Sequence, residues 1–393
     1  MRTAIAGLVL AGLTTAAPAD DPKPPPAGKA GAGAEKVEAK AGKEKKGPSL
    51  KVGDKAPPLK ADKWLQGGEV SEFAPGKVYV VEFWATWCGP CIVMMPHMAD
   101  LQKEYRDQGL TVIGYSAHDA NNTGEMVAAF VKKRGPKLGY TFAYAGDRDT
   151  YDAWMKAAGR NGIPCSFVVD RAGAVAYIGH PMYLGMILPK LMAGSWTKDD
   201  AAAVGKAEKE VNEVFRAIGA PDAAAGLEAL AGFEAKYPGL GQVPYFVGPK
   251  LGLLLKAEKF DEARTMADAV IARAADREDP TALRSVSAAL RSAPKDRKEF
   301  TALGVKAAEL GVKVAGDKDA LALLNLAEAY QAAGDAGKAK AAAGKAVAAA
   351  EDGSAALKRY VKTQAKKFDD EDKKDGDKKD GDGKKEKDGA GKK

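Results

Sequence analysis

Two cysteines, Cys88 and Cys91, are separated by two residues in the run WCGPC at residues 87–91. Thiols at this spacing can exchange a disulfide with another molecule, because one thiolate attacks and the second resolves the mixed disulfide. The same two residues could instead pack as small apolar side chains or form half of a zinc site. Since the chain has only three cysteines and no second pair to complete a zinc site, we expect redox chemistry here.

The residues around this motif predict a strand followed by a helix. Residues 77–84 (KVYVVEFW) are rich in β-branched and aromatic side chains, as is typical of a buried strand. Apolar residues then recur at helical spacing over residues 92–101. Cys88 is therefore expected at a helix N-terminus, where unpaired N–H groups and the helix dipole stabilise a thiolate. Pro90 has no N–H to lose in a first helical turn, and it stiffens the loop.

Glu82 is an acid inside this otherwise apolar strand. A buried carboxylate is costly unless it is neutralised or useful, and a raised pKa would suit a general base for Cys91. The alternative is that Glu82 turns to the edge of the sheet and is solvated.

The WCGPC run is identical to the active-site motif of thioredoxin, and residues 50–196 resemble the extracytoplasmic TlpA/ResA-type thiol–disulfide oxidoreductases. Supporting matches are VGDKAP at residues 52–57, Pro96 five residues after the second cysteine, and GIPCSFVVDRAG at residues 162–173. The resemblance implies an α/β thioredoxin-like domain with a central mixed sheet flanked by helices.

The resemblance also implies roles for single residues. Cys88 would attack the substrate disulfide, and Cys91 would release the product with a proton exchanged through Glu82. The Ile163–Pro164 peptide bond would be cis and would face the cysteines, although the residues alone also allow an ordinary turn there. The residues expected to contact substrate are Trp87, Gly89, Pro90 and Ile163.

Two positions depart from the family pattern or add to it. Met94 stands three residues after the second cysteine, where many members that reduce apocytochrome carry Glu, so a role in cytochrome maturation is not favoured. Cys165 follows the expected cis-proline. Strand alternation predicts that Cys165 points away from the other two cysteines, as a buried small apolar residue rather than a third redox thiol.

Residues 197–365 are Ala- and Leu-rich segments separated by Pro and Gly, which predicts an all-α region. The expected helices are 199–218, 222–236, 244–257, 260–275, 280–292, 296–314, 318–333 and 336–350. A run from Leu323 to Ala346 resembles the tetratricopeptide pattern, which implies a helical-hairpin array that binds a protein partner along a concave face. The alternative is a helical bundle that packs on the redox domain or dimerises.

The ends of the chain bear on its location. Residues 1–19 resemble a secretory signal peptide with an Ala-Pro-Ala cleavage signal, the alternatives being an uncleaved anchor or a buried helix. Residues 20–49 are predicted to be a disordered linker and residues 366–393 a disordered Lys/Asp-rich tail. We therefore expect an extracytoplasmic protein, periplasmic or secreted.

Composition indicates which classes of binding partner to expect. The net charge of the 393 residues is only +7, so a nucleic-acid-binding face is not indicated, and no apolar run is long enough for a stable membrane span. We expect reduction of disulfide-containing proteins without cofactor or metal, an upstream protein reductant, and a redox domain (50–196) that works when separated. The alternatives are an interaction module centred on the helices and a thiol peroxidase of the same fold.

Overall fold

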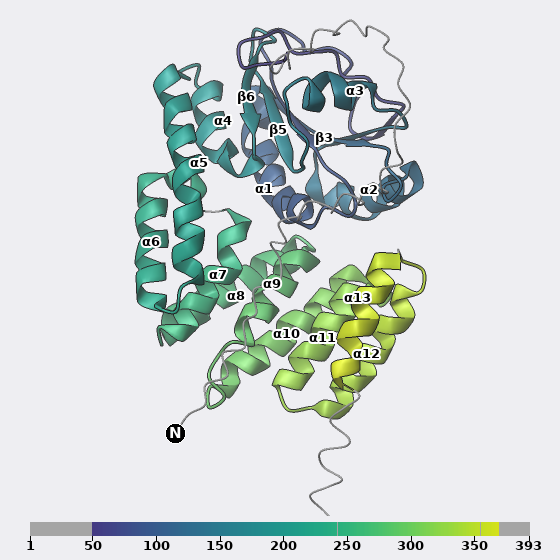
Figure 1. The fold of residues 1–393 in the computed structure, drawn as a ribbon, viewed down its shortest axis with the longest axis vertical. Helices are drawn as coiled ribbons and strands as arrows, with labels where there is room; N and C mark the ends of the chain where they lie inside the picture. The colour runs from purple at the N-terminus through teal and green to yellow at the C-terminus, as the bar shows by residue number, and fades with distance from the viewer. Residues whose placement is uncertain (1–48, 242, 354, 369–393) are drawn as a thin grey trace, which may run out of the picture. The chain divides into compact units, whose positions relative to one another are not determined.

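The computed structural model describes residues 49–241, 243–353 and 355–368 (Figure 1). The expected signal peptide, the linker up to residue 48 and the tail from residue 369 lie outside these residues. The disordered tail was predicted to begin at residue 366. The structure instead has a 3-10 turn (η5) at Lys366–Phe368, in which Phe368 is buried. Among the described residues, no helix is both long and apolar enough to cross a membrane.

The N-terminal part contains a six-stranded mixed sheet, which confirms the expected thioredoxin-like fold class. The strands are β1 (Lys63–Gln66), β2 (Val78–Phe83), β3 (Leu110–Ala117), β4 (Thr141–Ala145), β5 (Cys165–Val169) and β6 (Val175–Gly179). Their order across the sheet is β1-β4-β3-β2-β5-β6. The β2–β3 and β3–β4 pairs are parallel and the other three are antiparallel, so β2 is central and every residue of it is buried.

Side chains of β2 alternate between two apolar layers. Val80 and Trp84 belong to the cluster that packs under α1, whereas Val81 and Phe83 belong to the cluster on the opposite face. Glu82 shares the strand parity of Val80 and Trp84, so it lies on the α1 face of the sheet. The strand thus delivers one acid to the same layer as the redox motif.

The helices of this part flank the sheet. They are α1 (Gly89–Tyr105), α2 (Gly124–Leu138), α3 (Asp149–Tyr151) and α4 (Leu184–Met192), with short turns η1 (Arg106–Gln108), η2 (Asp152–Lys156, a π-helix) and η3 (Pro181–Tyr183). Helix α1 begins at the redox motif itself, with Cys88 as its N-cap and Pro90 in its first turn. Pro96 lies inside α1, as expected.

The C-terminal part is all α-helix, as expected. Its helices are α5 (Lys198–Gly219), α6 (Ala223–Lys236), α7 (Pro244–Lys256), α8 (Phe260–Asp276), α9 (Pro280–Leu290), α10 (Lys298–Ala315), α11 (Ala320–Ala332), α12 (Ala336–Ala350) and α13 (Ala355–Ala365), with η4 (Pro238–Leu240) before α7. Neighbours in sequence such as α11 and α12 lie side by side (Figure 1). Eight of these helices match the expected segments closely, and α13 is additional.

Side-chain caps explain where several of these helices begin. Thr197 and Asp200 form a reciprocal capping box at the start of α5. Asp222, Asp279 and Asp319 accept backbone N–H groups in the first turns of α6, α9 and α11. Each cap satisfies donors that the helix itself leaves unpaired.

The helical region is packed directly on the redox domain. One apolar cluster runs from Leu188 of α4 through Val211 of α5 to Phe246 of α7. Backbones also meet here, because a Cβ atom on Gly185 of α4 would overlap the carbonyl oxygen of Gly239 in η4. The two regions therefore share a core rather than touching through polar surfaces.

Candidate active site

Cys88 and Cys91 form a disulfide at the N-terminus of α1. Cys88 is 3% exposed and Cys91 2% exposed. The backbone N–H of Cys91 donates to the Cys88 sulfur at 3.2 Å, so the first turn of the helix points a donor at this atom. The neighbouring Gly89 and Pro90 are exposed. Exposed residues therefore flank the disulfide, although both cysteines are themselves buried.

The loop before Cys88 is held by a buried amide that sequence reasoning missed. The N–H and the hydroxyl of Thr86 donate to Asn122 Oδ1 at 2.8 and 2.9 Å. Asn122 Nδ2 in turn donates to Ser116 Oγ at 2.8 Å and to the Ala117 carbonyl at 2.9 Å. Because Asn122 comes just before the N-cap of α2, its sequence context indicates only a turn, and the contact with Thr86 is visible only in three dimensions.

Glu82 lies on the α1 face of the sheet and is 5% exposed, so it is buried rather than solvated at the sheet edge. Ser166 is its direct partner on β5, and the Ser166 hydroxyl donates to Glu82 Oε2. Oε1 has no hydrogen-bond partner among the described residues. Burial raises the pKa of Glu82 to about 8, and the Ser166 hydrogen bond opposes this only in part. The carboxyl group can therefore take up or release a proton near neutral pH.

The Ile163–Pro164 peptide bond is cis, as the resemblance implied. It comes directly before β5, whose first residue Cys165 pairs with Phe83 at the end of β2. Since β2 continues into the WCGPC loop, the cis-proline loop and the cysteine loop lie at the same edge of the sheet. Ile163 is half-buried and packs against both apolar clusters.

Cys165 lies on the other face of the sheet, as strand alternation predicted. It belongs to the apolar cluster with Phe83 and Phe167, whereas Cys88 and Cys91 belong to the cluster under α1. Burial raises the pKa of the Cys165 thiol to about 12, which keeps it protonated. It therefore takes the place of a small apolar residue.

Trp87 is the exposed aromatic side chain at the rim of the motif. Its residue surface is 55% exposed, and its indole N–H donates to Asp119 Oδ2 at 3.0 Å. This hydrogen bond orients the ring while leaving its faces open to a partner.

Comparison with known proteins agrees with this geometry. Residues 51–182 match the family described as Redoxin. Protein FixW of Rhizobium leguminosarum is 35% identical over 152 residues, which cover 38% of this chain and 69% of that protein. The chain belongs to the redoxin family. The expectation of a thioredoxin-like oxidoreductase of TlpA/ResA type is thereby confirmed.

The chain covers a smaller share of the second relative, and the solved structure has a lower sequence identity. The thiol-disulfide oxidoreductase ResA of Geobacillus thermodenitrificans is 32% identical over 125 residues, 32% of this chain and 59% of ResA. A solved structure of a putative thiol:disulfide interchange protein DsbE from Chlorobium tepidum is 26% identical, covers 38% of this chain and all of that chain, and has a TM-score of 0.30. The redoxin match ends before α4, so the tetratricopeptide-like interpretation of the helical region stays a prediction.

A side chain of the helical region forms a hydrogen bond with the loop that carries the two cysteines. The hydroxyl of Tyr245 in α7 donates to the Pro90 carbonyl at 2.8 Å. The Tyr245 ring also packs 5.5 Å from the ring of His180, which caps η3. Sequence reasoning missed this contact, because a tyrosine in an apolar helix carries no signal that it contacts a residue 155 positions earlier.

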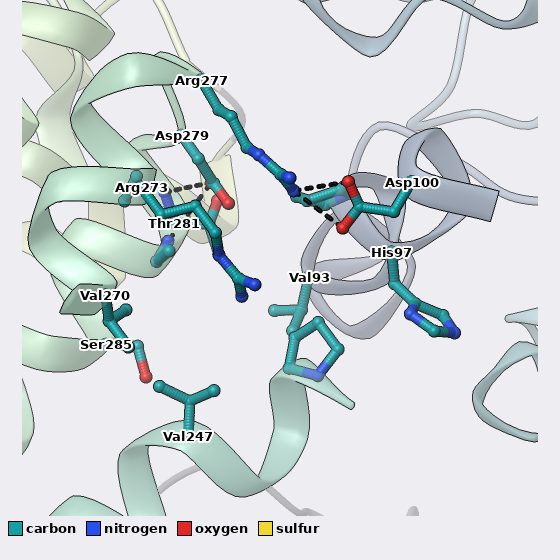
Figure 2. Close-up of a pocket in the computed structure, with 14 residues that line it drawn as sticks. Val93, His97, Asp100, Val247, Val270, Arg273, Arg277, Asp279, Thr281 and Ser285 are labelled. Atoms are coloured by element: carbon teal, nitrogen blue, oxygen red, sulfur yellow. Dashed lines mark hydrogen bonds and ion pairs between the residues drawn. The ribbon is translucent and has the colours of Figure 1, made fainter. Parts of the chain in front are cut away.

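Ion pairs also connect the helical region to α1 and α2 of the redox domain. Arg277 donates to Asp100 of α1 at 2.7 Å, as Figure 2 shows. Arg134 of α2 pairs with Asp279 at 3.4 Å, and their side chains are only 15% and 10% exposed. A cavity of about 80 Å³ lies beside the first pair and is lined by residues of α1, α7, α8 and α9. It includes neither cysteine, so it is not the site of the redox chemistry.

Proposed function

We propose that this protein is an exported enzyme that reduces disulfides in other proteins through Cys88 and Cys91. The observation that carries the proposal is the Cys88–Cys91 disulfide at the start of α1, on the same face of the sheet as a buried carboxyl group. This arrangement supports the roles proposed for Cys88 as nucleophile, Cys91 as resolving thiol and Glu82 as proton acceptor.

The reduced enzyme would act in two exchanges. The Cys88 thiolate attacks one substrate sulfur, a mixed disulfide forms, and the other substrate sulfur leaves as a thiolate. The Cys91 thiol then passes its proton to the Glu82 carboxylate and attacks the Cys88 sulfur. The second substrate thiolate is released, and the enzyme is left with the Cys88–Cys91 disulfide. Two electrons pass to the substrate, whose thiolates take protons from solvent.

The residues around the disulfide would hold the substrate chain. Trp87, Gly89 and Pro90 are exposed beside it, and Ile163 and Pro164 are half-buried at the adjoining edge of the sheet. An extended segment of substrate could lie between the two loops, with its backbone beside residue 163. Another protein must then return the enzyme to the dithiol state, because the two cysteines are left oxidised after each turnover.

The export of the chain rests on residues 1–19 and on the chemistry itself. An oxidising compartment supplies protein disulfides as substrates, whereas cytosolic proteins are kept reduced. Recovery of the mature protein from a periplasmic extract, with an N-terminus near residue 20, would agree with this proposal. Recovery of the full-length chain from the cytoplasm alone would contradict it.

Reduction of insulin disulfides tests the activity. The wild-type protein should reduce insulin, Cys88→Ser should lose the activity, and Cys165→Ser should retain it as the matched control. Cys91→Ala should accumulate mixed disulfides whose partners can be identified. If the wild type consumes peroxide rapidly but leaves insulin intact, the thiol peroxidase alternative is correct instead.

A protein partner on the helical region is a separate proposal. Leu323, Ala327, Ala339 and Ala346 of the tetratricopeptide-like run are all buried between α11 and α12. Gly334 between these helices has φ +80°, a conformation that favours glycine. These features support a helical-hairpin array of the kind that binds protein segments. Loss of co-purifying partners on deletion of α11–α13, with insulin reduction unchanged, is the expected result.

A further inference from the structure

One peptide group of the active-site loop is hydrogen-bonded at both ends. This is the group between Pro90 and Cys91. Its carbonyl oxygen accepts the hydroxyl of Tyr245 at 2.8 Å. Its N–H, which belongs to Cys91, donates to the Cys88 sulfur at 3.2 Å. A continuous hydrogen-bonded chain therefore runs from helix α7 to the sulfur that attacks the substrate.

The two hydrogen bonds of this peptide group affect each other's strength. A donor on a carbonyl oxygen draws electron density toward it, and amide resonance then leaves more positive charge on the N–H of the same group. Hydrogen bonds in a chain polarise one another in this way, by about 10–30% per bond. A stronger N–H donor stabilises a thiolate more than it stabilises a neutral thiol.

We propose that Tyr245 is a positioning residue that strengthens the Cys91 N–H donor and so stabilises the Cys88 thiolate of the reduced enzyme. The inference rests on the proposed function, and it gives the helical region a direct effect on the redox chemistry. Tyr245 does not contact either sulfur and acts only through the peptide group.

The surroundings of Tyr245 hold its hydroxyl in place. The ring packs against the apolar cluster under α1, and Val243 and Phe246, which lie near it in sequence, are buried. The Arg277–Asp100 ion pair ties α8 to α1 close to α7 (Figure 2). Burial, with a smaller contribution from the charge of Glu82, raises the pKa of Tyr245 well above its ordinary value. The phenol therefore keeps its proton and stays a donor.

The test compares Tyr245→Phe with the wild type in the reduced state. Alkylation of Cys88 by iodoacetamide is followed by mass spectrometry across a pH series. We expect the Cys88 pKa to rise, and the alkylation rate below that pKa to fall about two- to threefold, as the loss of 10–30% of a charge-assisted hydrogen bond implies. Tyr330→Phe is the matched control, since the Tyr330 hydroxyl donates to Glu309 at 2.8 Å within the helical region.

Two results would overturn the inference. One is an unchanged Cys88 profile in Tyr245→Phe, and the other is an equal shift in Tyr330→Phe. Circular dichroism checks the fold of each variant. Tyr245→Leu is a second variant that lacks the hydroxyl, and it must show the same shift in the Cys88 pKa. Alkylation needs no protein substrate. A wild type that fails to reduce insulin but shows the Tyr245 shift would therefore contradict only the proposed function.

Discussion

Glu82 is an ionisable residue that is buried in the core without full hydrogen bonding to the residues that the structure describes. It lies in the central strand among apolar side chains, yet one carboxyl oxygen lacks a hydrogen-bond partner among the described residues. Its pKa of about 8 means that the folded protein holds this proton at a pH where the unfolded chain has released it. The group therefore costs stability near neutral pH, and the proposed proton transfer from Cys91 would give that cost a function.

The first prediction is a pH-dependent gain in stability for Glu82→Gln. Because the folded pKa lies above the unfolded value of 4.5, the free energy of unfolding of the wild type should fall as pH rises from about 4.5 to 8. The variant should lose this slope and be more stable by about 1–3 kcal/mol at pH 7. Urea unfolding at several pH values measures this, with exposed Glu69→Gln as the control that keeps the slope.

The second prediction concerns the order of reaction of the two thiols. Cys88 is the N-cap of α1 beside exposed Gly89, whereas Cys91 lies within the helix. Limited alkylation of the reduced protein near neutral pH should therefore label Cys88 first, as peptide mass spectrometry can show. Faster labelling of Cys91 would reverse the roles assigned to the two cysteines.

At the scale of single residues, the sequence predicts the role of a residue when a motif or strand pattern around it carries the signal. The WCGPC run identifies both cysteines, and strand alternation predicts that Cys165 points away from them. Asn122 and Tyr245 were not predicted. Their role depends on which backbone groups lie within about 3 Å after folding, and no local pattern encodes that distance.

At the scale of elements, Asp279 connects the two regions. It caps α9 through the N–H groups of Thr281 and Ala282, and the same oxygen pairs with Arg134 of α2. The cap begins a helix in one region, and the ion pair neutralises a half-buried cation in the other. One carboxylate therefore supports both elements.

The third prediction follows from these two roles. Asp279→Ala should cost about 3–5 kcal/mol, because it removes a cap and leaves the half-buried Arg134 charge without its carboxylate partner. Asp222→Ala is the matched control, since Asp222 caps α6 through Ala225 at 3.0 Å. That change should cost about 1 kcal/mol. Equal losses in chemical unfolding would mean that the ion pair contributes nothing.

Helices were predicted well because caps and Pro or Gly breaks mark their ends. Predicted bounds such as 260–275 for α8 differ by one residue from those observed. Helix α13 was not predicted, because its apolar positions are sparse and it precedes a charged run. It forms because Val361 and Phe368 complete the apolar cluster of α11 and α12. Packing between neighbours, rather than local preference, decides such a helix.

At the scale of the whole molecule, the predicted independence of residues 50–196 has to be weighed against the shared core. Leu188 and Leu191 of α4 lie in the same apolar cluster as Val204 and Val211 of α5. A chain that ends at residue 196 would expose the partners of α5 to water. Exposed apolar area of this kind reduces stability by about 25 cal/mol for each Å².

The fourth prediction is that residues 50–196 still fold and reduce insulin, but with a lower Tm than the longer chain. The truncated protein should also bind more of a hydrophobic dye such as ANS, because the α4 face is uncovered. Calorimetry and dye fluorescence measure both effects. An equal Tm and equal dye binding would show that the helices contribute no burial to the redox domain.

The approach of Gly185 to Gly239 has a consequence for how this architecture can diversify. Neither position can gain a side chain unless the opposing backbone moves first, since each would overlap the other. Point changes at either one are therefore selected against while the helices stay docked. Descendants of this chain should keep glycine at both positions together, or lose it at both after the helical extension has been released or replaced.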